Sequence, residues 1–470
     1  MPDYVSKNSS GFERRLSLIN VWSLAFGCIV GWGAYVMPGT VFLKRAGPFG
    51  TLIAMETAAL IMLIMSYNYA YMMKRYPVSG GEFVYAKRSF GDKHGFICAW
   101  FLSLCYISII PMNATALCLI FRALKPEALQ FGFHYVIAGY DIYLGEVLLA
   151  LSALIIFALV SMKRAEIGGK LQTIFVIILL CGIGIVICGI IFNPSASLLK
   201  LQPMFHPKDA EHGGVVSQII SVLVVAPWAY VGYDIVPKLT SEAEFEPKFI
   251  KSVMDTSILC GCFVYTGLTL TAAIGIPESY SSWVEYIADL PKLSGAESIA
   301  TFSAARQVLG QLGVIVISIS GMMAMLTGIL GFYVGTSRLL YAMSKAGMLP
   351  EWFSELNANK VPGNAVKFCL CVSSLAPFVG RNALGWTVDM SSIGGAVSLG
   401  YTSLSSMKIA LAEGRTDMKI FGSVGFIFSV IFVLLLLVPV SGLNCSLEMP
   451  SYILLIVWVI LGMKFYSRKY

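Results

Sequence analysis

The chain has 470 residues, of which 57% are hydrophobic and only 13% are charged. Average soluble domains carry about 25% charged residues, so this composition excludes an ordinary soluble protein. The net charge is +7. The excess of lysines and arginines is explained by membrane topology, so it gives no reason to expect a nucleic-acid partner.

Apolar stretches long enough to cross a bilayer follow one another along the whole chain. A membrane-spanning helix needs about 20 predominantly apolar residues. We therefore predict about twelve such helices, near residues 16–44, 49–73, 96–121, 143–161, 171–192, 215–239, 252–276, 309–340, 365–380, 386–408, 420–439 and 452–466.

Lysines and arginines are concentrated in every second connection between these stretches. The positive-inside rule then predicts a multi-pass protein of a cell membrane, plasma or inner, with both termini in the cytoplasm. The first residues, MPDYVSKNSSGFERR, are not followed by a short apolar region with a small-residue cleavage site. We therefore expect the first stretch to be retained as a membrane helix, and we expect membrane lipid to be a partner of the protein as a whole.

The first stretch contains helix-breaking residues at membrane depth, in GCIVGWGAYVMPGT, residues 27–40. Irregular backbone at that depth is tolerated only where it is buried in protein or lines a cavity. We therefore expect a break at Gly31-Trp32-Gly33 that faces an internal site. The alternative is close helix packing, because Gly27 and Gly31 have the spacing of a small-residue contact.

The sixth stretch carries a second set of helix breakers, in SVLVVAPWAYVGYDIVPK, residues 221–238. Pro227 removes a backbone donor and disfavours helical geometry at Ala226. Stretches one and six occupy corresponding positions in two halves of five stretches each. Paired interrupted helices of this kind indicate the binding site of a secondary transporter.

Four segments in this order resemble the amino acid-polyamine-organocation (APC) superfamily, whose members have the LeuT-type fold. They are VGWGAYVMPG at 30–39, AGPFG at 46–50 with YPVSGGEFVYAKRSFGDKHGF at 76–96, AYVGYDIVPKLTSEAEFEPK at 229–248, and SRLLYAMSKAGMLPEWFSELNANKVPGNAV at 337–366.

The resemblance implies an all-α integral membrane protein with helices 1 and 6 broken. It implies one transporter domain over 1–470, made of a 5+5 inverted repeat and two C-terminal helices. The first repeat would cover 16–192, the second 215–408, and the additional helices 420–466.

The sequence departs from the superfamily pattern at two points that concern the site. Trp32 stands where a small residue is more usual. Many sodium-independent members carry a lysine in helix five, at a position that aligns roughly with Leu179. The first departure affects the shape of the pocket, and the second affects the coupling ion.

Helix ends at the two breaks suit the two charged groups of an amino acid. Free amides bind a carboxylate, and freed carbonyls bind an ammonium group. The resemblance implies that the amides of Gly31, Trp32, Gly33 and Ala34 hold the carboxylate, and that carbonyls near Ile29, Ala226 and Ala229 hold the amine.

Two aromatic residues follow Pro227 and are candidates for covering the substrate. Trp228 or Tyr230 could close over it or stack on a cationic group. The alternative for both is ordinary packing, which accounts for most aromatic residues in a chain that is 12% aromatic.

Ionisable residues at membrane depth are candidates for coupling and gating because burying them is costly. Glu56 and Asp234 could carry a proton, but Glu56 could instead lie near the outer interface and Asp234 could brace helix six. Ser318, Ser320 and Thr327 could bind sodium, although hydroxyls commonly bond their own helix backbone. Coupling to a proton or plain exchange is favoured over sodium.

The acidic run after helix six is a further candidate. It contains Glu242, Glu244 and Glu246, and it is either a solvated surface or a cytoplasmic gate that pairs with Arg338 and Lys345.

These observations predict a secondary active transporter of amino acids or related small amines. The alternative is a transport-silent amino-acid sensor or partner subunit with the same fold. No catalytic motif has useful spacing, so an enzyme is not expected. The 11 cysteines show neither metal-ligand nor disulfide spacing, so no metal or cofactor is expected.

Overall fold

The structure is a computed structural model that describes residues 12–137, 139–194, 196–208, 213–380, 382–440, 443 and 445–467. Within these residues, nine helices are long and apolar enough to cross a membrane, and two shorter apolar helices cover Leu18–Ile29 and Gly363–Phe378. The predicted all-α membrane fold is confirmed. One two-stranded hairpin, β1 (His134–Ile137) with β2 (Tyr140–Tyr143), stands outside the helical bundle.

Helix one is interrupted as predicted. Its first part is α1 (Leu18–Ile29). Ser17 caps this helix, because its hydroxyl accepts the Asn20 amide in a capping box. The chain is then non-helical until α2 (Gly33–Met37), which continues as a π-helical turn, η1 (Pro38–Phe42).

The predicted gap between the first two stretches, at residues 45–48, is not a loop. Helix α3 (Leu43–Arg75) runs across it with a kink at Gly47, where φ is 69°. Only a residue without a β-carbon takes this conformation easily. The second part of helix one and helix two are therefore separated by a kink and not by a longer loop.

The rest of the first half follows the expected order. Its elements are α4 (Glu82–Phe90), α5 (Asp92–Leu124), α6 (Leu144–Ser161), α7 (Ala165–Phe192) and η2 (Leu198–Leu201).

Helix six is broken more extensively than helix one. It consists of α8 (Val215–Leu223), the single turn α9 (Ala226–Ala229) and the 3-10 segment η3 (Tyr233–Leu239). Pro227 has no amide hydrogen, so the carbonyl of Leu223 loses its helical donor.

The remaining elements complete the second half and the C-terminal pair. They are η4 (Pro247–Phe249), α10 (Ile250–Ile274), α11 (Trp283–Asp289), η5 (Leu290–Lys292), η6 (Gly295–Ser298), α12 (Ala300–Lys345), η7 (Glu351–Ser354), α13 (Gly363–Ser373), η8 (Ala376–Phe378), α14 (Asn382–Glu413), α15 (Thr416–Leu437) and α16 (Met449–Ser467).

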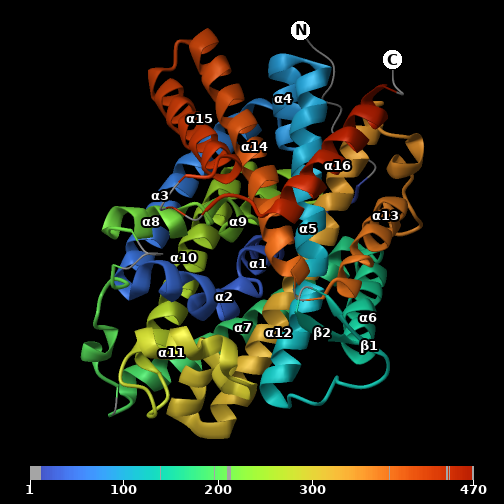
Figure 1. Cartoon of the computed structure of the whole chain (residues 1–470). Helices are drawn as coiled ribbons and strands as arrows, with labels where there is room; N and C mark the ends of the chain where they lie inside the picture. Colours follow the sequence, from blue (N-terminus) through green and yellow to red (C-terminus); the bar gives the residue numbers. More distant parts are fainter. Residues whose placement is uncertain are drawn as a thin grey trace.

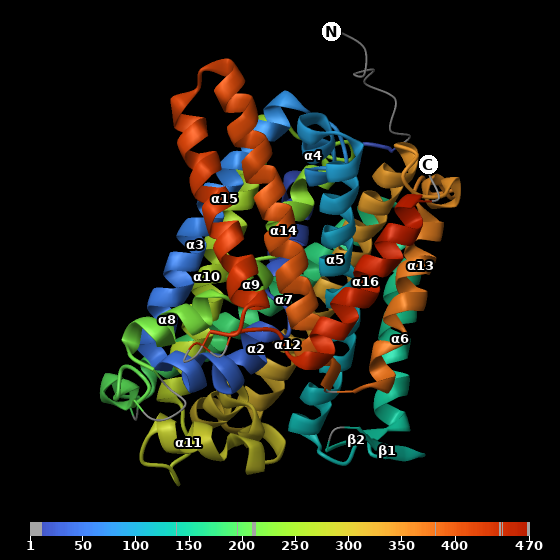
Figure 2. The ribbon, with the colours of Figure 1, turned by 45° about the horizontal axis from the view of Figure 1, so that its top comes forward.

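The broken helices lie inside the bundle. Figures 1 and 2 show α1, α2 and α9 in the middle of the molecule, with α4 and the end of α16 at one end and α11 and the hairpin at the other. Of the 18 most apolar consecutive residues in α5, 89% are buried, whereas in α16 the share is 11%. Helix α5 therefore belongs to the core around the breaks, and α16 belongs to the periphery.

Candidate functional site

The break in helix one frees backbone donors in the centre of the bundle. The amide of Trp32 donates to Asn113 Oδ1 at 3.3 Å, and the amide of Ala34 donates to the Gly31 carbonyl at 3.3 Å. Within the described part of the chain, the amides of Gly31 and Gly33 donate no hydrogen bond. Of the four predicted carboxylate donors, these two glycine amides are the ones left to bind a ligand.

The break in helix six lies against the break in helix one. Gly232 has φ of 140°, and a β-carbon there would lie 2.8 Å from the Ile29 amide nitrogen and 2.6 Å from Cys28 Cβ. Glycine is required at this position both by its backbone conformation and by the close approach of the two chains.

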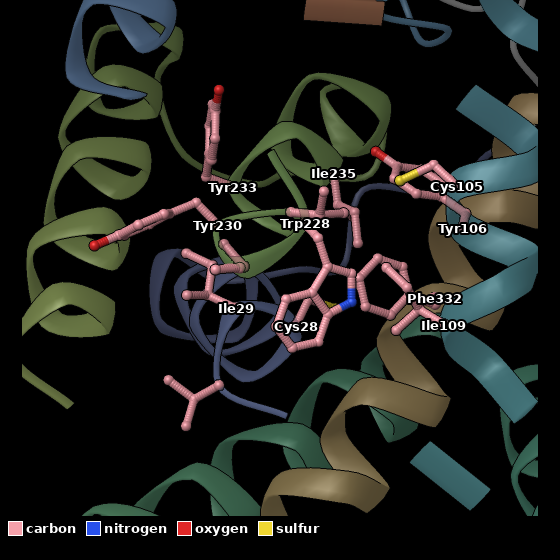
Figure 3. Close-up of a cluster of buried hydrophobic side chains, with 14 of the residues drawn as sticks. Cys28, Ile29, Cys105, Tyr106, Ile109, Trp228, Tyr230, Tyr233, Ile235 and Phe332 are labelled. Carbon is pink, nitrogen blue, oxygen red and sulfur yellow. The ribbon is translucent and has the colours of Figure 1, made fainter. Parts of the chain in front are cut away.

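Trp228 covers the break in helix one. A β-carbon at Gly33 would lie 2.2 Å from Trp228 Cη2, and the rings of Trp32 and Trp228 have centroids 5.9 Å apart. Figure 3 shows the Trp228 indole beside Phe332 and Ile109, in a mostly apolar surrounding. The structure thus brings together Gly33, Trp32 and Trp228, three of the residues that the sequence analysis proposed for the substrate site.

Tyr230 does not share this position. Its hydroxyl donates to the Met55 carbonyl of α3 at 3.1 Å, and in Figure 3 its ring points away from Trp228. Its geometry supports packing between helices, the alternative role considered for this residue.

Two of the three carbonyls expected to hold the amine already accept one hydrogen bond each. Ile29 O accepts the Tyr265 hydroxyl at 3.1 Å, and Ala226 O accepts the Tyr230 amide at 3.1 Å. A carbonyl oxygen has two lone pairs, so each can accept a second donor. Ala229 is also buried at the break.

Asn113 of α5 is a site residue that sequence reasoning missed. It is 1% exposed, and its Nδ2 donates to the Ile109 carbonyl while its Oδ1 accepts the Trp32 amide. Glycines on both sides make room for it, since a β-carbon would lie 2.9 Å from its Oδ1 at Gly31 and 2.6 Å from its Nδ2 at Gly328. An asparagine within an apolar helix was the available signal.

Comparison with known proteins agrees with this geometry. A family model described as amino acid permease matches residues 16–461. The chain belongs to the amino acid permease family.

Three relatives illustrate the range of this family. A branched-chain amino acid permease of Lactococcus lactis subsp. cremoris (strain MG1363) is 25% identical over 76% of this chain and 73% of its own length. A methylthioribose transporter of Bacillus subtilis (strain 168) is 24% identical over 98% and 95%. An arginine/ornithine antiporter of Pseudomonas aeruginosa is 24% identical over 75% and 68%.

Membership confirms the predicted superfamily and the general function. The permease is a multi-pass membrane protein that transports amino acids or related small amines by secondary transport. No feature of the described residues favours the sensor alternative.

The two carboxylates predicted as coupling candidates lie in different surroundings. Asp234 is 4% exposed and holds the helix-six break together: its Oδ1 accepts the Gly232 amide at 2.8 Å and its Oδ2 accepts the Tyr106 hydroxyl. Glu56 is exposed on α3, seven residues after exposed Phe49 and four before exposed Leu60. The permease brings Asp234, and not Glu56, to the paired breaks.

Two of the three hydroxyls predicted as sodium ligands donate hydrogen bonds. Ser320 Oγ donates to the Leu179 carbonyl at 2.8 Å and pairs with the Tyr35 hydroxyl, and Thr327 Oγ1 lies 2.7 Å from the Ala324 carbonyl of its own helix and 2.9 Å from the Gly27 carbonyl. Ser318 is buried in the same helix, and its hydroxyl has no hydrogen-bond partner among the described residues.

Helix α7 reaches the contact between α1 and α12 through Gln172, which lies seven residues before Leu179. Its Nε2 donates to the carbonyls of Ser23, at 3.4 Å, and of Thr327, at 3.2 Å. A neutral amide donor therefore fills this contact in the permease.

The acidic run after helix six is not a plain surface. Glu242 is 2% exposed and forms a two-bond ion pair with Arg338, at 2.9 Å and 3.0 Å. The predicted pairing of this run with Arg338 is therefore present at Glu242. Glu244 and Glu246 are exposed, and so is Lys345, which lies over the Tyr341 ring instead.

Proposed function

We propose that this permease carries a neutral amino acid across a cell membrane by alternating access. The carrying observation is the chemistry around the paired breaks. The side chains that contact them are aromatic, aliphatic or a neutral amide, and the nearby carboxylate, Asp234, is engaged by Gly232 and Tyr106. A substrate whose side chain carries a positive charge would lack a counter-charge there.

The carboxylate of the substrate would bind the amides of Gly31 and Gly33. Both lie at the beginning of the outer half of helix one, where the helix dipole favours a negative charge. The indole nitrogen of Trp32 is a further donor, because it is buried and has no hydrogen-bond partner among the described residues. Buried donors of this kind favour a ligand with acceptor oxygens.

The amine of the substrate would bind carbonyls at the same breaks. The second lone pairs of Ile29 O and Ala226 O support this role, as does the carbonyl of Leu223, which loses its helical donor to Pro227. A polyamine has no carboxylate, so it would leave the amides of Gly31 and Gly33 unsatisfied.

Trp228 would act as the cover of the site. Its ring lies in contact distance of Gly33, so it has to shift before a carboxylate can reach the Gly33 amide. Such a shift links binding to a conformational change, which alternating access requires.

Coupling to a proton or plain exchange is part of the proposal, in preference to sodium. The support comes from Gln172, whose NH₂ group donates to the carbonyls of Ser23 and Thr327 and so occupies acceptor oxygens where the sodium candidates lie. We also propose that both termini are cytoplasmic and that the permease catalyses no chemical reaction.

Uptake into proteoliposomes tests the proposal. Purified permease would be offered radiolabelled leucine, and competition would be measured with leucine, arginine and putrescine, with and without sodium and a pH gradient. We expect competition by neutral amino acids in sodium-free buffer. Competition by arginine or putrescine alone, or a strict need for sodium, would overturn it.

A further inference from the structure

The link between α6 and α7 carries two basic side chains at one end of the bundle. It consists of residues 162–164, and Lys163 and Arg164 are both exposed and have no ion-pair partner among the described residues. Helix α6 begins beside the hairpin, so this link lies at the opposite end, the α4 end (Figure 2). It is therefore one of the connections proposed to be cytoplasmic.

The link lies at the edge of the apolar membrane-facing surface. Leu159, near the end of α6, is 54% exposed, and Ile167, in the first turn of α7, is 51% exposed. Large exposed apolar side chains on two membrane-spanning helices face lipid. The three residues between the helices therefore lie at the level of the lipid headgroups, where basic side chains are favoured.

A crevice opens beside this link, between α1, α6, α7 and α12. Its wall includes Leu24, Val160 and Val334, and the two basic residues of the link also line it. Arg338 and Glu242 belong to the lining as well, but they pair with each other and add no net charge. The crevice thus combines an apolar wall with a positively charged mouth.

Gly168 leaves open space in this crevice. It is buried on α7, yet a β-carbon there would meet no atom within 4 Å. Protein interiors are closely packed, so such a space at a buried position is unusual. Gly169 differs, because a β-carbon there would lie 3.0 Å from Leu16 Cδ2. The open space is therefore confined to the side of α7 on which Gly168 lies.

A third basic residue is fixed beside the link by the connection between α12 and α13. Lys360 has φ of 60°, which is uncommon for a residue with a side chain. Asn357 Oδ1 holds this turn by accepting the amides of Asn359 and Val361. The side-chain amides of Asn357 and Asn359 both donate to the Met162 carbonyl, at 2.9 Å and 3.1 Å. The two connections are thereby fastened together.

The surroundings of the mouth leave positive charge uncompensated. Glu13 and Glu166 both lie in ion-pair distance of Arg15. Arg164 and Lys360 act on Glu13 only through their charge and from a greater distance. An anion at the mouth of the crevice would therefore be attracted.

We propose that this crevice binds an anionic phospholipid. Its phosphate would pair with Lys163 and Arg164, and the first part of one acyl chain would enter the space over Gly168. Clusters of basic residues next to membrane-spanning helices attract anionic lipids, and each basic side chain adds to the attraction. The apolar wall and the position at headgroup level favour a lipid over a free phosphate ion. The proposal goes beyond the transport function, and its test does not measure transport.

Native mass spectrometry of the purified permease tests the proposal. The protein would be equilibrated in detergent with equal amounts of phosphatidylglycerol and phosphatidylcholine, and the lipids that stay bound would be counted. We expect the wild type to retain phosphatidylglycerol in preference to phosphatidylcholine. Equal retention of the two lipids would overturn the proposal.

The charged part of the site is tested by a double variant. In Lys163→Gln/Arg164→Gln we expect retained phosphatidylglycerol to fall at least tenfold. Lys125→Gln/Lys208→Gln is the matched control, because it removes the same charge from exposed positions at the other end of the bundle, and it should retain the lipid as the wild type does. Wild-type retention in the first variant would overturn the site.

The apolar part is tested by filling the open space. Gly168→Val should lower phosphatidylglycerol retention while both basic side chains remain. Gly184→Val on the same helix is the control, since a β-carbon there also meets nothing within 4 Å. Unchanged retention in Gly168→Val would contradict the entry of an acyl chain.

Two other occupants would be recognised in the same experiments. A free anion is tested by thermal shift, because a bound ligand raises the melting temperature. Stabilisation by inorganic phosphate equal to that by phosphatidylglycerol, and lost in Lys163→Gln/Arg164→Gln, would overturn the assignment to a lipid. A second copy of the chain in the crevice would give a dimer in the mass spectra that Gly168→Val abolishes, and this result would overturn it too.

Discussion

The indole of Trp228 lies on the backbone of Gly33, so closely that a β-carbon at position 33 would be 2.2 Å from Cη2 of the ring. Residues 195 positions apart in the chain are thus in direct contact at the two helix breaks. Any side chain at position 33 pushes the ring away and reduces access to the amide proposed to bind the carboxylate.

We expect Gly33→Val to abolish leucine binding in a protein that remains folded and monodisperse. Gly184→Val on α7 is the matched control, because a β-carbon there would meet nothing within 4 Å. Binding would be measured by thermal shift and uptake by proteoliposome assay. Normal uptake by Gly33→Val would contradict the role of this glycine.

The position of Trp228 over the break in helix one predicts that this residue contributes to substrate affinity. Trp228→Ala removes the ring that encloses the substrate, so we expect the apparent affinity to fall at least tenfold, which corresponds to about 1.4 kcal/mol. Trp352 is 43% exposed in a connecting segment, and Trp352→Ala should have little effect. Equal, small effects of both substitutions on KM would mean that Trp228 only packs.

Asn113 is expected to position the break of helix one. Asn113→Ala leaves the Trp32 amide without its acceptor, which costs about 1–3 kcal/mol for a buried group, and we expect both a lower melting temperature and a raised KM. Asn68, which is also buried and donates to the Phe421 carbonyl, provides the comparison. Asn68→Ala should lower stability without raising KM; a raised KM in both variants would indicate a general structural effect.

The proposed sodium independence can be tested at the contact between α1, α7 and α12. Thr327→Val removes the hydroxyl that donates to the Gly27 carbonyl, and we expect it to reduce stability without creating or removing a sodium requirement. Uptake would be compared in sodium and choline buffers. A strict sodium requirement in the wild type that Thr327→Val abolishes would instead point to Thr327 as a ligand.

The two membrane-depth carboxylates should respond differently to neutralisation. Asp234 lies at the breaks with Tyr106 and Lys238, whereas Glu56 lies on an exposed face of α3. If a carboxylate carries the proton, Asp234→Asn should remove the pH dependence of uptake while counterflow exchange survives. Glu56→Gln should change neither. Loss of pH dependence in Glu56→Gln alone would reverse this assignment.

Local sequence signals were sufficient to predict the breaks. Glycine and proline act on their own backbone, so Gly31, Gly33 and Pro227 indicate where a helix ends whatever surrounds it. The order of apolar stretches then indicated which two breaks would meet, and the contact of Trp228 with Gly33 agrees with that expectation.

The partners of these residues could not be predicted in the same way. Trp32 and Asn113 are 81 positions apart and Asp234 and Tyr106 are 128 apart, so these contacts depend on how helices pack. The exposure of Glu56 could not be predicted either. Its helix is apolar on all sides, so the hydrophobic pattern does not distinguish the lipid-facing side from the buried side.

The kink at Gly47, where φ is 69°, leaves only a very short connection between the second part of helix one and helix two. A movement of one is therefore passed directly to the other. The first part, α1, is joined to the second part through the non-helical residues 30–32, and side-chain hydrogen bonds hold it to α7 and α10. The two parts of helix one thus differ in what moves with them, and the rates of opening on the two sides of the membrane need not be alike.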